Sequence, residues 1–338
     1  MRDHRTFSAL ILVATCLAPV NTAAQSASPG RDARMEVPRT PDGRPDLQGT
    51  WTNATLTPLE RARAMGDRKF YTEQEVRELE TRTATQRSAA NERPATASVA
   101  GGNVGSYNNF WLDSGDRVLS TRQTSLVVDP PDGRVPVRPE AEAHRDEYLR
   151  RSGESPEFMS VWDRCISRGA PGWVIPAGYN NAYQIVQTRD YVVIHAEMIH
   201  DARIIPVTDR EPLPPSVKQW EGDSRGRWEG DTLVVETTNF TNRNWIATSA
   251  ASGRIKGIPQ SEALRIVERF TRISRDEIAY EARIEDPAVF TQPWTLAFPL
   301  TRDDEYRIYE YACHEGNYAV ENILRGARYL DRAGNTSR

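Results

Sequence analysis

Apolar and polar positions alternate along much of the chain after residue 181, which is the pattern of strands that bury one face. Turn residues such as Thr188-Arg189-Asp190 and Ser274-Arg275-Asp276 separate most of these segments. The pattern predicts strands at 182–187, 191–199, 232–240, 264–273, 277–284, 294–300 and 307–313, with earlier ones at 49–53 and 124–129. Because short turns join antiparallel neighbours and closure removes exposed edges, we expect a mainly β fold, an antiparallel sheet that curls or closes into a barrel.

Helical patterns are few and lie outside the predicted strands. Thr72-Glu73-Gln74-Glu75 is a capping box, so a helix should begin there and end near Arg82. Further helices are expected across 140–151 and 318–331. We expect 25–48 to be an extended arm, 83–106 a surface loop, and 49–338 a single β-rich domain with peripheral helices.

The first 24 residues have the organisation of a secretory signal peptide. Arg2, His4 and Arg5 precede an apolar run at 7–20, and small residues follow at 22–24. This run is shorter than the roughly 20 residues that a membrane-spanning helix needs. We therefore predict cleavage near Ala24, a periplasmic or secreted protein and no membrane span. A lipid anchor at Cys16 is the alternative.

Cys165 and Cys313 remain after removal of such a signal peptide. An even cysteine count in an oxidising compartment favours a disulfide, the alternative being a buried pair that never meets. A bridge would bring the residues around Cys165, among them Asp163 and Arg164, close to His314 and Glu315. We therefore expect a polar cluster at one rim of the sheet.

Composition and motifs exclude several classes of function. The 338 residues include 43 basic and 47 acidic side chains, so no basic surplus is present to bind nucleic acid. The glycine-containing segment 222–231 lacks the Lys-Ser/Thr ending of a phosphate loop, and we interpret it as a hairpin. A serine-hydrolase elbow is also absent from the sequence. We accordingly expect no organic cofactor.

The segment 191–206 carries the candidate chemistry, including two of the five histidines. Strand alternation would place His195 and Glu197 on one face, about 6.5 to 7 Å apart, as a base and the carboxylate that orients it. His200 and Asp201 complete the predicted catalytic set. Alternatives are a solvent-facing pair, an Asp201–Arg203 ion pair, and a zinc or iron site of His195, Glu197 and His200 or His314.

Ligand contacts are expected from side chains that offer stacking surface or hydrogen bonds near the predicted strand ends. Each also has a structural interpretation, as part of an ion pair, a turn or the core. These predicted ligand-binding residues are Arg203, Tyr183, Asn181, Arg164, Trp51 and Arg227.

Two resemblances add to this picture. Gly49-Thr50-Trp51 resembles the opening of lipocalin-like (calycin) barrels, which implies that Trp51 plugs one end of a cup. Several segments resemble a large family of exported proteins from soil and aquatic bacteria, most specifically GDSRGRWEGDTLVVETTNF, which begins at Gly222. The second resemblance implies export but no established activity, so no catalytic role is carried over from it.

Together these features predict an exported β-barrel that encloses a small hydrophobic or aromatic molecule. The leading hypothesis is a cofactor-independent enzyme that moves a proton, such as a lyase, hydratase or isomerase. The alternatives are a non-catalytic periplasmic ligand-binding module and a metal-dependent enzyme using His195, Glu197 and His200.

Overall fold

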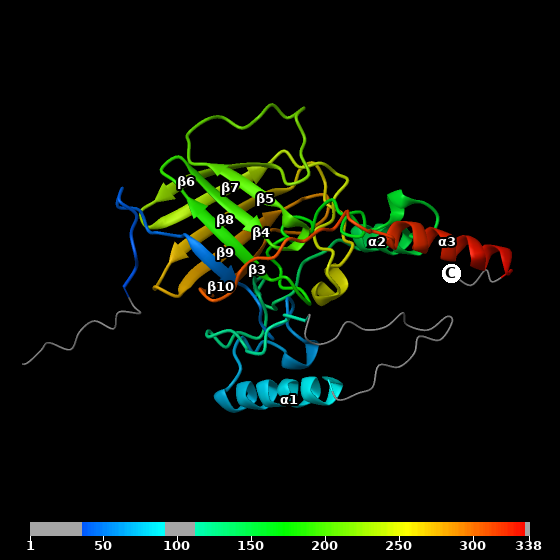
Figure 1. The fold of residues 1–338 in the computed structure, drawn as a ribbon, viewed down its shortest axis with the longest axis horizontal. Helices are drawn as coiled ribbons and strands as arrows, with labels where there is room; N and C mark the ends of the chain where they lie inside the picture. Colours follow the sequence, from blue (N-terminus) through cyan, green and yellow to red (C-terminus); the bar gives the residue numbers. More distant parts are fainter. Residues whose placement is uncertain (1–35, 92–111, 335–338) are drawn as a thin grey trace, which may run out of the picture.

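The computed structural model describes residues 36–91 and 112–334 (Figure 1). The expected signal peptide, the first part of the arm and much of the loop expected at 83–106 lie outside the described residues.

Nine strands form an antiparallel barrel that is nearly closed. Their order around the barrel is β5-β4-β3-β1-β10-β9-β8-β7-β6, and β2 pairs with β10 beside this path. A parallel bridge between Val207 and Gly226 brings the two edge strands together. The fold class predicted from the alternation is therefore confirmed. The strands are β1 (Gly49–Thr52), β2 (Val127–Asp129), β3 (Ala182–Gln187), β4 (Tyr191–Ala196), β5 (Ala202–Pro206), β6 (Asp223–Glu229), β7 (Thr232–Thr238), β8 (Arg265–Arg272), β9 (Glu277–Glu285) and β10 (Trp294–Arg302).

Alternate residues of each strand point inward and fill the barrel. Tyr280 shows the register, because it lies opposite Phe270 on β8 and Phe298 on β10, and all three rings are buried. Gly226 occupies an inward position where the two edge strands β5 and β6 meet, and an added Cβ would come within 3.1 Å of Ile205. A barrel of this size has an interior just wide enough for side chains to fill. The inward side chains of the strands belong to one cluster of buried hydrophobic residues, and the cavity described below lies outside the barrel.

One ion pair is buried in this core. Arg203 donates from two nitrogens to the Glu268 carboxylate, at 2.7 and 3.1 Å, and both side chains are buried. Tyr280 Oη donates to the same carboxylate at 2.9 Å, while Arg203 also donates to Ser224 Oγ and Thr237 Oγ1. Arg203 therefore pairs across the barrel with Glu268 rather than with its neighbour Asp201.

Different segments close the two ends of the barrel. At one end the indole of Trp51 is fully buried, donates to the carbonyl of Leu47 and lies under the guanidinium of Arg272 at 4.8 Å. At the other end lie residues 159–181, which we call the plug. Its Trp173 stacks against Arg203 at 4.3 Å and accepts a hydrogen bond from Tyr183 Oη at its carbonyl.

The helices lie outside the barrel, with α1 (Glu73–Asn91) apart from α2 (Pro139–Arg150) and α3 (Ala319–Arg332) (Figure 1). The predicted capping box is present, since the backbone N–H groups of Thr72 and Glu75 each donate to the other's side chain. No helix in residues 36–91 or 112–334 has the length and apolar content to cross a membrane.

Strands β5 and β6 were not among the predicted strands, and three predicted elements have other bounds or are absent. Helix α1 continues to Asn91 instead of ending near Arg82. Strand β4 ends at Ala196, because Glu197 turns into a short 3-10 helix in which Ile199 has a left-handed φ of 63°. Residues 307–313 form no strand, since β10 is already paired with β1 and β9.

Candidate ligand-binding site

A cavity of about 970 Å³ lies outside the barrel, against the plug. Residues 303–318, which we call the strap, lead from β10 to α3 and form its opposite wall. Glu197, at the end of β4, contributes from the barrel itself. We call this space the end cavity. Its lining residues are Asp113, Trp162, Asp163, Cys165, Tyr179, Asn180, Glu197, Tyr306, Tyr309, Glu310, Tyr311, Ala312, Cys313, Asn317 and Ala319.

Covalent and hydrogen bonds fix the strap to the rest of the chain. Cys165 of the plug and Cys313 of the strap form the predicted disulfide, with Cα atoms 5.7 Å apart. Asn317 Nδ2 donates to the carbonyl of Asp163 at 2.9 Å. At the start of the strap, the backbone N–H of Asp303 donates to the carbonyl of Thr50 on β1. The shape of the end cavity therefore depends on contacts between segments far apart in sequence.

Glu197 is the most buried acidic residue of the end cavity, with no exposed surface. Tyr306 Oη donates to both of its carboxylate oxygens, at 2.8 and 3.0 Å, and the backbone N–H of Tyr309 donates at 3.3 Å. Burial raises the pKa of the Tyr306 phenol, and its bond to the Glu197 carboxylate raises it further. Tyr306 therefore stays protonated and acts as a neutral donor to Glu197.

Asp113 lies at the rim of the same cavity. Although Asp113 keeps an exposed surface, its pKa is raised above the ordinary value, chiefly because the neighbouring protein partly withdraws the carboxyl group from water. Repulsion from Glu197 and Asp303 acts in the same direction. A hydrogen bond from the backbone N–H of Asn181 opposes this shift. The end cavity thus combines a buried carboxylate with a second carboxyl group that takes up a proton more readily than usual.

Aromatic side chains supply most of the large surfaces of the end cavity. Trp162 and Tyr179, both from the plug, have ring centroids 6.1 Å apart. Tyr306 and Tyr309 of the strap are also 6.1 Å apart and nearly perpendicular. Rings held in this way offer flat surfaces on which a planar or apolar molecule can stack.

The structure brings His195 and His200 together but does not place the four predicted catalytic residues in one cavity. His195 lies on the outer face of β4, with its ring edge-on to His200 at 4.4 Å, and neither histidine lines the end cavity. Burial lowers the pKa of His195, and the neighbouring His200 lowers it further. Burial raises the pKa of Asp201 to about 6. Of the four residues, only Glu197 lines the end cavity. Strand β4 ends at Ala196, so the alternation of strand faces no longer determines where Glu197 points.

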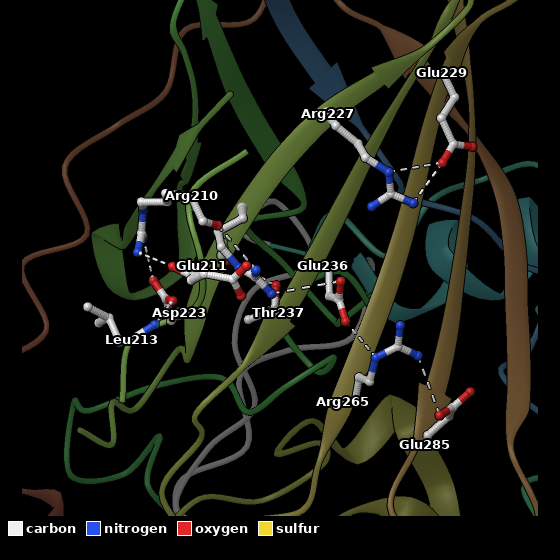
Figure 2. Close-up of polar contacts among 12 residues, drawn as sticks. Arg210, Glu211, Leu213, Asp223, Arg227, Glu229, Glu236, Thr237, Arg265 and Glu285 are labelled. Carbon is white, nitrogen blue, oxygen red and sulfur yellow. Dashed lines mark hydrogen bonds and ion pairs between the residues drawn. The ribbon is translucent and has the colours of Figure 1, made fainter. Parts of the chain in front are cut away.

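Most predicted ligand-binding residues make bonds that hold the fold. Asn181 is buried, and its side chain bonds the backbone of Ala177 and Asp113. Arg164 is only partly exposed. Arg227 lies on the outer face of β6 and donates a hydrogen bond to Glu229 at 2.7 Å, as Figure 2 shows. Tyr183, Arg203 and Trp51 belong to the packed barrel described above. None of the six lines the end cavity.

Among the described residues, no three His, Cys, Asp or Glu side chains come close enough together to hold a metal ion. The alternative site of His195, Glu197 and His200 therefore has no geometric support.

Sequence reasoning missed most of the end cavity. The tyrosines at 306, 309 and 311 were a visible pattern, but their spacing favoured a strand. The disulfide prediction did locate this region, since it placed Asp163 near the residues after Cys313. Asp113 belongs to a part of the chain without a recognisable pattern, so nothing in the sequence pointed to it.

Comparison of this chain with protein-family models, with curated proteins and with solved structures found no match. The site is therefore argued from its own geometry.

Proposed function

We propose that this protein binds a small organic molecule with an apolar or aromatic body in the end cavity. The observation that carries the proposal is the cavity itself, about 970 Å³ in volume and walled by five aromatic rings. This volume lies within the usual range for small-molecule sites, which are mostly apolar with few polar groups. Because a disulfide holds the strap against the plug, the site is largely formed before a ligand arrives.

A proton-transfer enzyme is the second candidate, and one observation favours it. Asp113, whose pKa is raised, lies at the same cavity as the buried Glu197. Carboxyl groups in such surroundings serve as general acids and bases in lyases, hydratases and isomerases. In such an enzyme Asp113 and Glu197 would be the acid–base pair, with Asp113 in place of His195.

We also propose that the protein is exported, with residues 1–24 removed as a signal peptide, and that it belongs to the family of exported bacterial proteins that it resembles. The disulfide is consistent with an oxidising compartment and supports this proposal.

The test of binding uses the neutral fluorescent probe N-phenyl-1-naphthylamine with the disulfide-intact protein. Ala312 lines the end cavity, so Ala312→Trp should fill part of it and abolish most of the fluorescence enhancement. Ala251→Trp is the matched control, because Ala251 is exposed on a short helical segment away from the end cavity. Probe binding that is unchanged in Ala312→Trp, or absent in the wild type, would contradict the proposed function.

A further inference from the structure

The charge of the end cavity points to the class of ligand, an inference that rests on the proposed function. Its lining includes the carboxyl groups of Asp113, Asp163, Glu197 and Glu310, and the lining residues include no lysine, arginine or histidine. A cavity of one sign attracts ligands of the opposite sign and repels those of its own.

Within residues 36–91 and 112–334, no cationic side chain forms an ion pair with these carboxylates. None of the four forms a salt bridge with any residue of the described chain. Glu197 accepts hydrogen bonds from neutral donors, and Asp163 accepts one from Ser160 Oγ at 2.8 Å. Hydrogen bonds of this kind satisfy the oxygen atoms but leave the negative charge in place.

Repulsion within the end cavity supports the same conclusion. Burial is the main cause that raises the pKa of Asp113, and the negative charge of Glu197 adds to it. The positive charge of Arg87 acts in the opposite direction without cancelling the shift. A cation placed between Asp113 and Glu197 would relieve this repulsion.

The aromatic walls suit a cation as well as an apolar body. A cationic group over the face of a tryptophan or tyrosine ring is attracted by the negative face of that ring. Trp162 and Tyr179 contribute such rings from the plug, while Tyr306, Tyr309 and Tyr311 contribute them from the strap. Carboxylates combined with aromatic rings form the usual surroundings of organic ammonium groups.

A second cation near the end cavity is Arg168, a buried residue of the plug. Burial lowers the pKa of its guanidinium, which interacts with the hydroxyl groups of Tyr183, Tyr179 and Tyr311. Arg168 is not part of the cavity lining, so it does not present its charge to a ligand there.

We propose that the end cavity binds an organic cation, a protonated or quaternary amine attached to an apolar or aromatic body. A bare metal ion fits less well, because it needs several ligand atoms converging on one point, and no group of three such side chains exists in the described parts of the chain.

Three probes of similar body and different charge test this inference by calorimetry on the disulfide-intact protein. They are 2-phenylethylamine, 2-phenylethanol and 3-phenylpropanoate. We expect the amine to bind about tenfold more tightly than the alcohol, a difference equal to about 1.4 kcal/mol, and the carboxylate to bind most weakly. Equal affinities, or tighter binding of the alcohol or the carboxylate, would overturn the inference.

A double variant, Glu197→Gln with Glu310→Gln, removes two negative charges from the end cavity and nearly preserves side-chain shape. We expect the preference for the amine over the alcohol to fall at least about fivefold. Glu211→Gln is the control, because Glu211 is exposed and outside the end cavity. A preference that survives in the double variant would also overturn the inference.

The naphthylamine probe keeps the two proposals distinguishable. If that neutral probe binds and Ala312→Trp blocks it, the binding function stands even when the three phenyl compounds show no preference for the cation. If none of the three phenyl compounds binds, the inference about charge is wrong, and the naphthylamine result alone decides the proposed function.

Discussion

The barrel interior and the end cavity each contain a glutamate with almost no exposed surface, Glu268 and Glu197, but the protein surrounds them differently. Glu268 accepts hydrogen bonds from two guanidinium nitrogens of Arg203, so its negative charge has a cationic partner. Among the described residues, Glu197 accepts hydrogen bonds from neutral donors alone, Tyr306 Oη and the backbone N–H of Tyr309. Burying a charge is costly unless it is paired. The comparison indicates that the first glutamate serves folding, whereas the second keeps a charge without a cationic partner beside the end cavity. In the proposed function, a ligand supplies that partner.

The largest effect is expected from Glu268→Gln. The substitution keeps the size of the side chain but leaves the buried Arg203 guanidinium without a counter-charge, and breaking such a pair costs about 3 to 5 kcal/mol. Urea denaturation should therefore show a free energy of unfolding reduced by that amount. A loss below about 1 kcal/mol would show that the pair is far better solvated than its burial implies.

A smaller loss is expected when the disulfide is removed. The double variant Cys165→Ser with Cys313→Ser frees the strap from the plug and restores the entropy of a long loop in the unfolded chain, so stability should fall by about 2 to 4 kcal/mol. Because the strap forms one wall of the end cavity, binding of N-phenyl-1-naphthylamine should weaken as well. Loss of stability with unchanged probe binding would show that the strap holds its position without the bridge.

The sequence predicted the barrel better than the site, and particular residues show why. Alternation predicts a strand wherever one face is buried, so β3 was located with its observed bounds, Ala182–Gln187. The same rule failed at Glu197, where the chain leaves the sheet, and at 307–313, where tyrosines face a cavity instead of a sheet partner. The partner of Arg203 was also hidden, because Glu268 lies 65 residues away in sequence. Such contacts depend on barrel closure, which local patterns do not encode.

A third glutamate, Glu221 next to the plug, is expected to make the stability of the protein depend on pH. Glu221 accepts a hydrogen bond from Ser167 Oγ, but burial raises its pKa from 4.5 to about 7, and Asp201 adds repulsion. Because the folded state holds this proton more tightly than the unfolded state does, Glu221 makes stability fall as pH rises from about 4.5 to about 7. Asp201, whose own pKa is raised to about 6, contributes in the same direction.

Glu221→Gln should remove part of this pH dependence. The variant should lose less stability than the wild type between pH 5 and pH 8, and one such group changes the slope by at most about 1.4 kcal/mol per pH unit. Denaturation curves at both pH values measure the difference, with the exposed Glu211→Gln as control. If wild type and Glu221→Gln have the same slope, the Glu221 carboxyl group titrates in the folded protein as it does in the unfolded chain.

Glu197→Gln is the direct counterpart of Glu268→Gln and should have the opposite sign. It removes an unpaired buried charge while a side-chain oxygen remains to accept from Tyr306, so stability should stay within about 1 kcal/mol of the wild type and shift upward. Denaturation under the conditions used for Glu268→Gln makes the two values comparable. If Glu197→Gln lowers the free energy of unfolding as much as Glu268→Gln does, the proposed difference between the roles of Glu197 and Glu268 is wrong.

The smallest effect is expected on the outer face of the barrel, at Arg227→Ala. Arg227 is about half exposed and bonds Glu229 on its own strand, as Figure 2 shows. Exposed pairs of this kind are screened by water and salt, so their removal changes stability by about 0.5 kcal/mol or less. Affinity for 2-phenylethylamine should also be unchanged, because Arg227 does not line the end cavity. Calorimetry of the variant measures both its stability and its affinity for 2-phenylethylamine. A clear loss of affinity would indicate that the amine binds at this outer face and not in the end cavity.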